Sequence, residues 1–259
     1  MLYAELDAFE PVAIHEHETG DGWRVFFRTA AQRDAAWATL ASEFGNALLD
    51  LAPLDVDDED WARRSQASLT AIRAGRIIVA PPWDLQSLIP DPSSLIIIID
   101  PSMGFGTGHH ATTRLCLELL QQVDLRAKRV IDVGTGSGVL AIAAWALGAS
   151  SVAAIDHDPD ALQNARENAE RNGATGAIEI LEVEISRVSL PPADLVCANL
   201  TGAVLQRYAD QLRRLVAPSG MLIVSGFSGD ELADVALAFH CASQHSLREA
   251  EWCAALYVI

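Results

Sequence analysis

The chain has 259 residues, of which 50% are hydrophobic and 20% are charged, and its formal net charge is −17. This length suggests one large domain or two unequal ones with a real core, and the composition excludes a disordered or collagen-like chain. The acidic surface disfavours direct binding to nucleic-acid phosphates and attracts basic partners. Residues 1–60 carry 14 acidic and 3 basic residues. A docking surface and a solvated acidic face explain that excess equally well.

The cysteines and the apolar segments indicate in which cellular compartment the protein is expected. The four cysteines are too far apart for a CxxC pair, so neither a disulfide framework nor a metal site is expected. Free thiols favour a reducing compartment. The first residues lack the basic and apolar regions of a signal peptide, and the apolar run at 95–99 is far shorter than the roughly 20 residues that span a membrane. We therefore expect a cytoplasmic protein without membrane attachment, with a monomer as the default.

Residues 1–56 predict a small, acidic α+β domain. Residues 23–28 alternate as a strand does, and residues 32–44 carry apolar side chains at helical spacing. Four consecutive acidic residues, at 57–60, then open a polar segment. Because acidic side chains suit the N-terminus of a helix, residues 57–72 predict a helical linker.

From residue 73 to 259, predicted strands and helices alternate. Such alternation, with nearly continuous apolar strands, predicts a Rossmann-like, doubly wound parallel sheet with helices on both faces. A C-terminal hairpin, at 246–249 and 254–258, closes the pattern. The other predicted strands are 76–80, 95–99, 129–132, 151–155, 178–183, 194–198 and 221–225, and the predicted helices are 111–123, 139–147, 159–172, 203–216 and 230–239.

Residues 130–138 read VIDVGTGSG, between a predicted strand and a predicted helix. Glycines there allow a tight turn and a close approach of a ligand to the backbone. A dinucleotide fingerprint requires a third glycine at position 139, where this chain has Val139. The loop therefore fits a nucleoside without a pyrophosphate better than NAD. Asp156, at the end of the next strand, can accept both ribose hydroxyls. A nicotinamide enzyme and a glycine turn without ligand remain alternatives.

A second glycine-rich segment, DPSMGFGTGHHATT at residues 100–113, enters a predicted helix. Thr112 or Thr113 suits the cap of that helix and can also present a hydroxyl to a ligand. His110 fits a ligand contact, and it fits a loop histidine bonded to backbone equally well.

These motifs together resemble the ribosomal protein L11 methyltransferase family of class I, S-adenosylmethionine-dependent enzymes. Further similar segments are DEDW at 58–61, IRAGR at 72–76, PPW at 81–83 and EWC at 251–253. The resemblance covers residues 57–259 and implies a class I methyltransferase domain at 73–259. Residues 1–56 agree in size and position with the family's N-terminal substrate-recognition domain.

The resemblance implies methyl transfer from S-adenosylmethionine to amine nitrogens, lysine side chains or the N-terminal amine, of a basic ribosomal protein of the large subunit. Asp132 fits a contact with the methionine moiety through water, or a structural turn. Phe105 and Trp83 fit the mouth of the pocket, or core packing. The candidate cofactor-binding residues are Phe105, Thr107, Thr113, Asp132, Gly134, Gly136, Asp156 and Asn199.

Asn199 is the candidate catalytic residue. The acceptor amine must be neutral, and a carboxylate beside it would stabilise the ammonium form. A neutral amide oxygen can aim the amine lone pair without holding the proton; alternatively, Asn199 caps the next helix. The family usually reads Asn-Ile-Leu-Ala where residues 199–202 read Asn-Leu-Thr-Gly. Another protein, or a small-molecule amine, is therefore an alternative acceptor.

Overall fold

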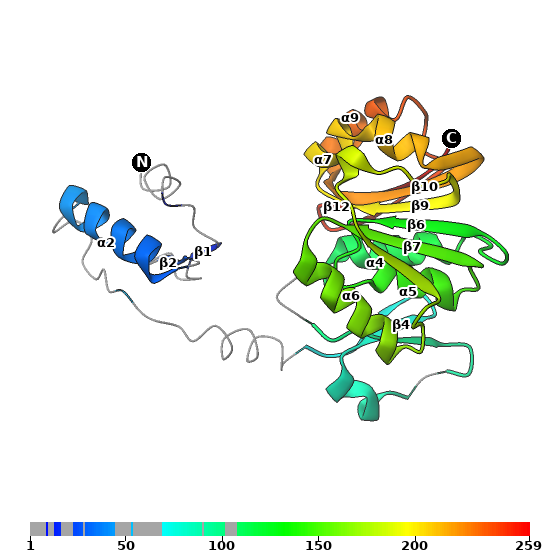
Figure 1. Cartoon of the computed structure of the whole chain (residues 1–259), viewed down its shortest axis with the longest axis horizontal. Helices are drawn as coiled ribbons and strands as arrows, with labels where there is room; N and C mark the ends of the chain where they lie inside the picture. The colour runs from blue at the N-terminus through cyan, green and yellow to red at the C-terminus, as the bar shows by residue number, and fades with distance from the viewer. Residues whose placement is uncertain are drawn as a thin grey trace. The chain divides into compact units, whose positions relative to one another are not determined.

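The structure is a computed structural model, and it describes residues 9, 13–16, 23–27, 29–44, 53, 69–89, 91–101 and 108–259. The chain divides into unit 1, Met1–Arg64, and unit 2, Ser65–Ile259 (Figure 1). The division falls inside the predicted linker, 57–72. Most of that linker lies outside the described residues. Its end is not helical, which corrects the prediction there, because residues 69–71 are irregular and a strand begins at Ile72.

Unit 1 contains strands and a helix, as predicted. β1 (Ala13–Glu16) pairs antiparallel with β2 (Trp23–Phe26), and α2 (Ala30–Phe44) follows. The helix begins two residues before the predicted start. Thr29 explains the difference, because its hydroxyl oxygen accepts a hydrogen bond of 3.2 Å from the backbone N–H of Gln32 and so caps the first turn.

The central sheet of unit 2 has seven strands in the order β11-β12-β10-β9-β6-β7-β8. The strands from β6 to β10 run parallel, and β12 is antiparallel to both of its neighbours. The predicted doubly wound sheet and its closing hairpin are therefore confirmed. The strands are β6 Arg129–Val133, β7 Ser151–Asp156, β8 Ile178–Glu182, β9 Ala193–Asn199, β10 Val216–Ser228, β11 His245–Glu249 and β12 Trp252–Val258.

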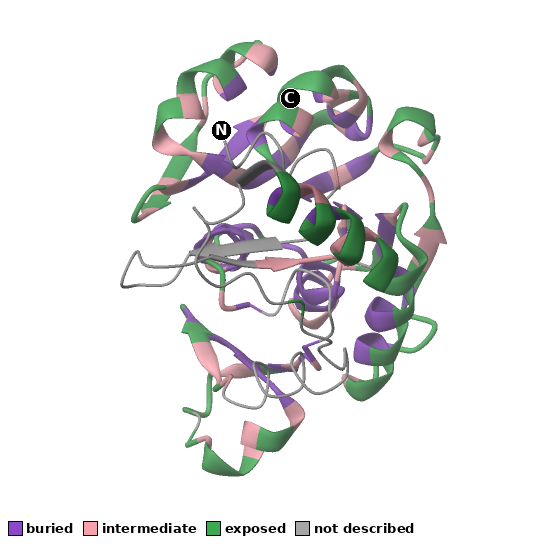
Figure 2. Ribbon diagram, turned by 90° about the vertical axis from the view of Figure 1, so that its left-hand side faces the viewer, coloured by how far each residue is buried: buried purple, intermediate pink, exposed green. Residues whose placement is uncertain are grey.

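Successive strand residues point to opposite faces of the sheet and enter two separate cores. Val130 of β6 packs in the core that contains α4 and α5, whereas Ile131 packs in the core that contains α7, α8 and α9. Figure 2 shows these buried residues in purple. Burial on both faces explains why the strands are apolar throughout. The helices are α4 Ala111–Leu120, α5 Val139–Ala146, α6 Pro159–Arg171, α7 Gly202–Arg207, α8 Ala209–Arg214 and α9 Leu232–Ala238.

The helix predicted at 111–123 ends earlier, at Leu120, and the one predicted at 230–239 begins as a 3₁₀ helix, η4 (Gly229–Glu231). Two other predicted elements differ more. The helix predicted at 203–216 is two short helices, because Tyr208 between them has φ −111° and ψ 20°. Val216 already belongs to β10, where it pairs with Ala193 of β9, so that strand is much longer than the predicted 221–225. Within the described residues, no helix is long and apolar enough to cross a lipid bilayer.

The first two strands predicted for the methyltransferase domain form a separate small sheet. β3 (Ile72–Ala74) pairs antiparallel with β4 (Ile77–Ala80), and β4 pairs parallel with β5 (Leu95–Ile98). Buried side chains of β4 and β5 join the same core as α4 and α5. A 3₁₀ helix, η2 (Pro82–Ser87), connects β4 to β5 and was not predicted. The small sheet therefore packs against helices, not beside the central strands.

A buried asparagine joins α6 to two distant segments. Asn168 is fully buried. Its Oδ1 accepts a hydrogen bond of 2.9 Å from the backbone N–H of Asp100, and its Nδ2 donates one of 3.0 Å to the carbonyl of Ser137. Ser137 belongs to the loop that follows β6, so Asn168 helps to hold that loop against α6.

We expect Asn168→Ala to lower the free energy of unfolding by about 2 kcal/mol, because it removes the hydrogen bonds that Asn168 makes with the Asp100 N–H and the Ser137 carbonyl. Gln163→Ala is the matched control, since Gln163 is exposed on the same helix and bonds only to Glu167 in the described structure. Its effect should stay within about 0.5 kcal/mol. Urea denaturation measures both. Equal losses in the two variants would contradict this role of Asn168.

Candidate functional site

Three strand ends meet at one edge of the central sheet. Val133, the last residue of β6, pairs with Ile155 of β7 on one side and with Ala198 of β9 on the other. The residues that follow these partners are Asp156 and Asn199, and the glycine loop, residues 134–138, follows Val133. The ligand crevice of an open α/β sheet lies at the carboxyl ends of its strands. This edge is therefore the candidate site.

The glycine loop has a conformation that its glycines permit. Gly134 has φ +70°, and a Cβ there would lie 2.5 Å from a methyl carbon of Leu200. Both Gly134 and Thr135 donate backbone hydrogen bonds to the carbonyl of Ile155, at 2.9 and 3.0 Å. The loop thus turns sharply over the end of β7 with Leu200 packed against it. An alanine at position 134 would be strained and would also displace Leu200.

Asp132 lies beneath this loop with 2% of its surface exposed. Its Oδ2 accepts hydrogen bonds of 2.6 Å from the hydroxyl of Thr135 and 3.1 Å from the backbone N–H of Ala141. It therefore joins β6 to the loop and to α5, which supports the structural alternative for this residue. Burial raises the pKa of the Asp132 carboxyl to about 6, although both hydrogen bonds lower it, and the charge of Asp156 raises it further.

Asp156 closes the other side of the loop. Its Oδ2 accepts a hydrogen bond of 3.0 Å from the backbone N–H of Gly136, and its Oδ1 accepts bonds of 2.8 and 3.2 Å from the backbone N–H groups of His157 and Asp158. The carboxylate is oriented before any ligand arrives. Oδ1 also lies 3.3 Å from the Nδ1 of His157, so Oδ2 is the oxygen with acceptor capacity left for a hydroxyl donor. Asp156 and Gly136, both predicted site residues, are therefore in direct contact.

Asn199 and Thr113 meet at the same edge. The Nδ2 of Asn199 donates a hydrogen bond of 3.3 Å to the hydroxyl oxygen of Thr113, whose side chain is buried. Among the described residues, the Oδ1 of Asn199 accepts no hydrogen bond and is left to receive a donor. The alternative that Asn199 caps the next helix is wrong, because the N-cap of α7 is Thr201.

The helix α4 begins at Ala111 as predicted, but its capping residue differs from the prediction. The N-cap is His110, whose Nδ1 accepts a hydrogen bond of 3.4 Å from the backbone N–H of Thr112 and lies 2.8 Å from the Thr112 hydroxyl oxygen. The capping alternative for Thr112 and Thr113 is therefore wrong. Thr113 is free of a capping role and faces Asn199 instead. The His110 ring also meets the ring of Trp252 edge-on, with 4.7 Å between centroids.

Of three further candidates, the structure describes only Trp83. Phe105 and Thr107 lie outside the described residues. Trp83 is 48% exposed, and its ring N–H donates a hydrogen bond of 3.1 Å to the carbonyl of Leu69. Core packing is therefore the wrong account of Trp83, and its described contact is with the segment that leads into β3.

Sequence reasoning missed one polar contact near the site. Arg114 of α4 forms a two-bond contact with Glu249 of β11, through Nε to Oε2 at 3.1 Å and through a second, shorter bond. The two residues are 135 positions apart, and neither stands in a recognisable motif. Only the packing of α4 against the C-terminal hairpin brings them together.

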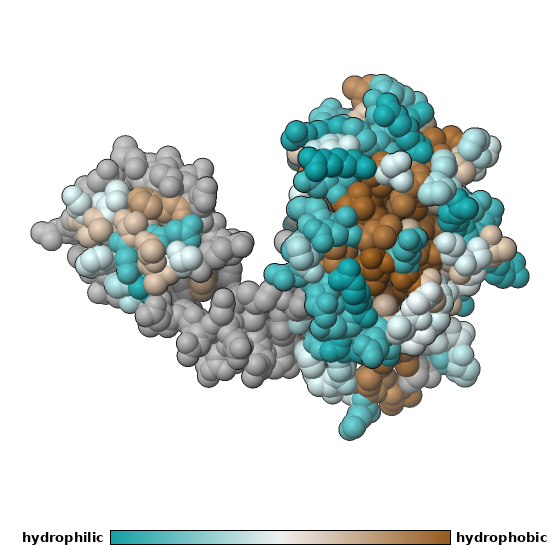
Figure 3. All heavy atoms as spheres, viewed as in Figure 1, coloured by the Kyte–Doolittle hydropathy of each residue, from teal (hydrophilic) through white to brown (hydrophobic). Residues whose placement is uncertain are grey.

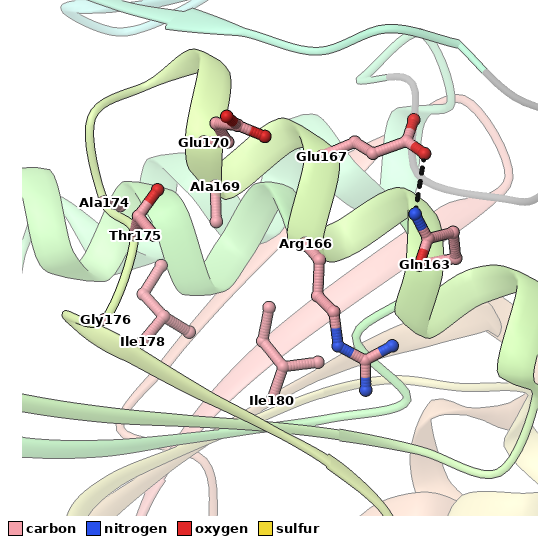
Figure 4. Close-up of a pocket in the computed structure, with 10 residues that line it drawn as sticks. All are labelled: Gln163, Arg166, Glu167, Ala169, Glu170, Ala174, Thr175, Gly176, Ile178 and Ile180. Atoms are coloured by element: carbon pink, nitrogen blue, oxygen red, sulfur yellow. Dashed lines mark hydrogen bonds between the residues drawn. The ribbon is translucent and has the colours of Figure 1, made fainter.

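A cavity of about 360 Å³ opens between α6 and β8 (Figure 4). Ile178 and Ile180 point into it from β8, and the side chain of Arg166 reaches toward them from α6. None of the described candidate residues lines it. Figure 3 shows apolar atoms in the middle of the face of unit 2 seen in that view. This cavity is distinct from the edge that carries the glycine loop.

Residues 5–258 match the family model of ribosomal protein L11 methyltransferase (PrmA). The ribosomal protein L11 methyltransferase of Vibrio campbellii is 40% identical over 203 residues, 76% of this chain and 67% of that protein. That of Photobacterium profundum is 37% identical over 201 residues, with the same coverage.

A crystal structure of a ribosomal protein L11 methylase from Lactobacillus delbrueckii subsp. bulgaricus superposes with a TM-score of 0.67 at 29% identity. The match covers 73% of this chain and 97% of the other. The predicted fold class, a Rossmann-like class I methyltransferase fold, is confirmed.

We expect Asp132→Asn to change how stability depends on pH. The wild-type carboxyl has a pKa of about 6 when folded against 3.8 for the ordinary group. Because the folded protein binds this proton more tightly, its ionisation costs up to about 3 kcal/mol as the pH rises from about 4 to about 6. An amide oxygen can accept the same two hydrogen bonds without the charge.

The variant should therefore be the more stable protein above about pH 7, by an amount that disappears near pH 4. Urea denaturation of both proteins across this range measures the difference. A variant that is less stable than the wild type near pH 8, or a difference that does not change with pH, would show that the Asp132 charge is not the determining feature.

Proposed function

Because the chain belongs to the ribosomal protein L11 methyltransferase family, we propose that it methylates amine nitrogens, lysine side chains or the N-terminal amine, of ribosomal protein L11. The chain is an S-adenosylmethionine-dependent methyltransferase. The acceptor chemistry is supported by the contact between Asn199 and Thr113: among the described residues, the neutral amide oxygen of Asn199, at the carboxyl end of β9, accepts no hydrogen bond.

The residues at the sheet edge fit S-adenosylmethionine. That cofactor supplies a methyl group activated by a sulfonium when it is bound. Asp156 lies close enough to Asp132 for its charge to raise the pKa of the Asp132 carboxyl, and a cationic ligand relieves that repulsion. The carboxylate of Asp156 is set to accept ribose hydroxyls, and the backbone of residues 134–138 can approach a ligand closely. Gly136 and Thr113 are the other described residues among the candidates for cofactor binding at this edge.

Asn199 orients the acceptor amine without holding its proton. Its Nδ2 donates a hydrogen bond of 3.3 Å to the Thr113 hydroxyl oxygen, which restricts rotation of the amide group. An amide oxygen accepts a hydrogen bond from a neutral amine but does not stabilise the ammonium form as a carboxylate does. The contribution of this residue is therefore position and orientation.

The N-terminal region supplies the attraction for a basic substrate. We propose residues 1–56 as a substrate-recognition domain and 57–72 as its linker, with the methyltransferase domain at 73–259. Residues 1–60 hold 14 of the 35 acidic residues but only 3 of the 18 basic ones. Complementary charge speeds encounter and sets orientation. The net charge of −17 favours contact with protein rather than with ribosomal RNA, and the proposed place of action is the cytoplasm, as a monomer.

One observation favours a different acceptor as the second candidate. A Cβ at Gly202 would lie 2.3 Å from Oε1 of Glu231, whose Oε2 accepts hydrogen bonds of 2.9 and 3.1 Å from the N–H and hydroxyl of Ser228. The family's usual alanine at position 202 would displace this carboxylate. Glycine at position 202 thus leaves room for the Glu231 carboxylate beside the segment after Asn199, and this departure from the family's usual sequence is what favours another protein or a small-molecule amine as the second candidate acceptor.

The test is incubation with methyl-labelled S-adenosylmethionine and the ribosomal proteins of a strain that lacks the enzyme. We expect label in L11 with the wild type. Asp156→Ala should lose it, because charged hydrogen bonds worth roughly 1.5–3 kcal/mol disappear, which weakens binding of S-adenosylhomocysteine by about 10–100-fold in calorimetry. Intact cofactor binding without label in L11 would reject this substrate and favour the second candidate.

Asn199→Asp tests the acceptor chemistry. A carboxylate there raises the pKa of the acceptor amine by roughly 1–3 units, so kcat/KM at neutral pH should fall by about 10-fold or more. The loss should shrink as the pH rises toward the amine pKa. Asn199→Ala is the control, and its loss should not depend on pH. The same pH profile in both variants would contradict the proposed role.

A further inference from the structure

Residues 108–113 form the last part of the second glycine-rich segment and the first turn of α4; we call them the arm. Gly108 has φ +86°, and a Cβ there would lie 3.1 Å from a methyl carbon of Val79 and 3.4 Å from a side-chain carbon of Ile72. The arm therefore packs closely on β3 and β4. At its other end, Thr113 contacts Asn199 at 3.3 Å.

On one side the arm is tied to the segment that enters β3. The Nε2 of His109 lies 2.8 Å from the carbonyl oxygen of Thr70. The next residue is held too, because the backbone N–H of Ala71 donates a hydrogen bond of 2.6 Å to Asp84. Residues 69–72 are the described end of the predicted linker. The arm is thus hydrogen-bonded to the place where the linker joins unit 2.

On the other side the arm is tied to the C-terminal hairpin. The guanidinium of Arg114 forms two hydrogen bonds with the Glu249 carboxylate and a third with the backbone carbonyl of His109. A two-bond contact between arginine and carboxylate fixes orientation as well as distance. The edge-on contact of His110 with Trp252 lies on the same side. Arg114 therefore joins β11 directly to the peptide that precedes α4.

We propose that Arg114 is a positioning residue of the methyltransferase: together with Glu249 it holds the arm so that Thr113 is aligned with Asn199 in the cofactor site. The contact of His109 with Thr70 holds the arm from the opposite side and connects it to the end of the predicted linker. The inference rests on the proposed function, because it takes Thr113 and Asn199 to contact S-adenosylmethionine.

The exposure of the pair favours positioning over global stability. The Arg114 side chain is 23% exposed and that of Glu249 is 43% exposed. Ion pairs that solvent reaches contribute little to the free energy of unfolding. Arg114 also spans two partners with a planar, forked group, a geometry that lysine cannot reproduce. Replacing Arg114 should therefore change the affinity for the cofactor more than it changes the melting temperature.

The test measures S-adenosylhomocysteine affinity by calorimetry, together with the melting temperature. We expect Arg114→Met and Arg114→Lys each to weaken binding by about 10-fold. Lys128→Met is the matched control: it breaks the comparably exposed pair with Asp194, 3.3 Å apart, at the opposite edge of the sheet, and should leave affinity within about two-fold. His109→Phe, which keeps the backbone acceptor of Arg114, should cause a smaller loss.

A double-variant cycle separates positioning from general loosening. Glu249→Ala should weaken binding as Arg114→Met does, and the double variant should be no weaker than either single variant. Glu249→Gln keeps one acceptor oxygen and should therefore bind more tightly than Glu249→Ala. If Arg114→Met does not fold, the comparison of these two Glu249 variants replaces it as the test. Unchanged affinity, additive losses, or an equal loss in Lys128→Met would overturn the proposal. Because this readout needs no protein substrate, it is unaffected if L11 proves to be the wrong acceptor.

Discussion

The parallel pairing of β6 with β7 and with β9 is the constraint on which the candidate site depends. It aligns Val133 with Ile155 and Ala198, so the next residue or segment of each strand emerges at the same edge. Gly134, Asp156 and Asn199 have no local reason to be neighbours. Parallel strands must be joined by crossover connections, usually helices. The helices that cover the sheet therefore also allow these three residues to lie side by side.

Buried polar groups hold the loop at that edge. Asp132 bonds to Thr135 and Ala141 from beneath, and Asn168 bonds to Ser137 from the side of α6. Each group would be costly to bury alone, yet each is satisfied by a segment that the site requires in a fixed position. The raised pKa of Asp132 shows that the cost is only partly offset. The fold accepts a strained, charged interior where a cationic ligand is proposed to bind.

Much of this was predictable from sequence, for physical reasons. The strand, glycine loop and helix at 130–147 are local patterns, and the acidic residue after the next strand follows from the same periodicity. Contacts between distant segments were not predictable: Arg114 and Glu249 meet only through tertiary packing. His110 rather than a threonine caps α4, and Tyr208 divides a helix that apolar spacing alone made continuous. These three features depend on residues that are close in the folded chain, and the periodicity of the sequence contains no information about such contacts.

Hydrogen exchange of the full chain, with and without S-adenosylhomocysteine, tests the central claim most directly. If the edge formed by β6, β7 and β9 is the cofactor site, the ligand should slow exchange in residues 134–138, 156–158 and 199–202, and in the arm at 108–113. Protection confined to the cavity between α6 and β8, at 163–180, would contradict the account, as would binding without protection of the glycine loop.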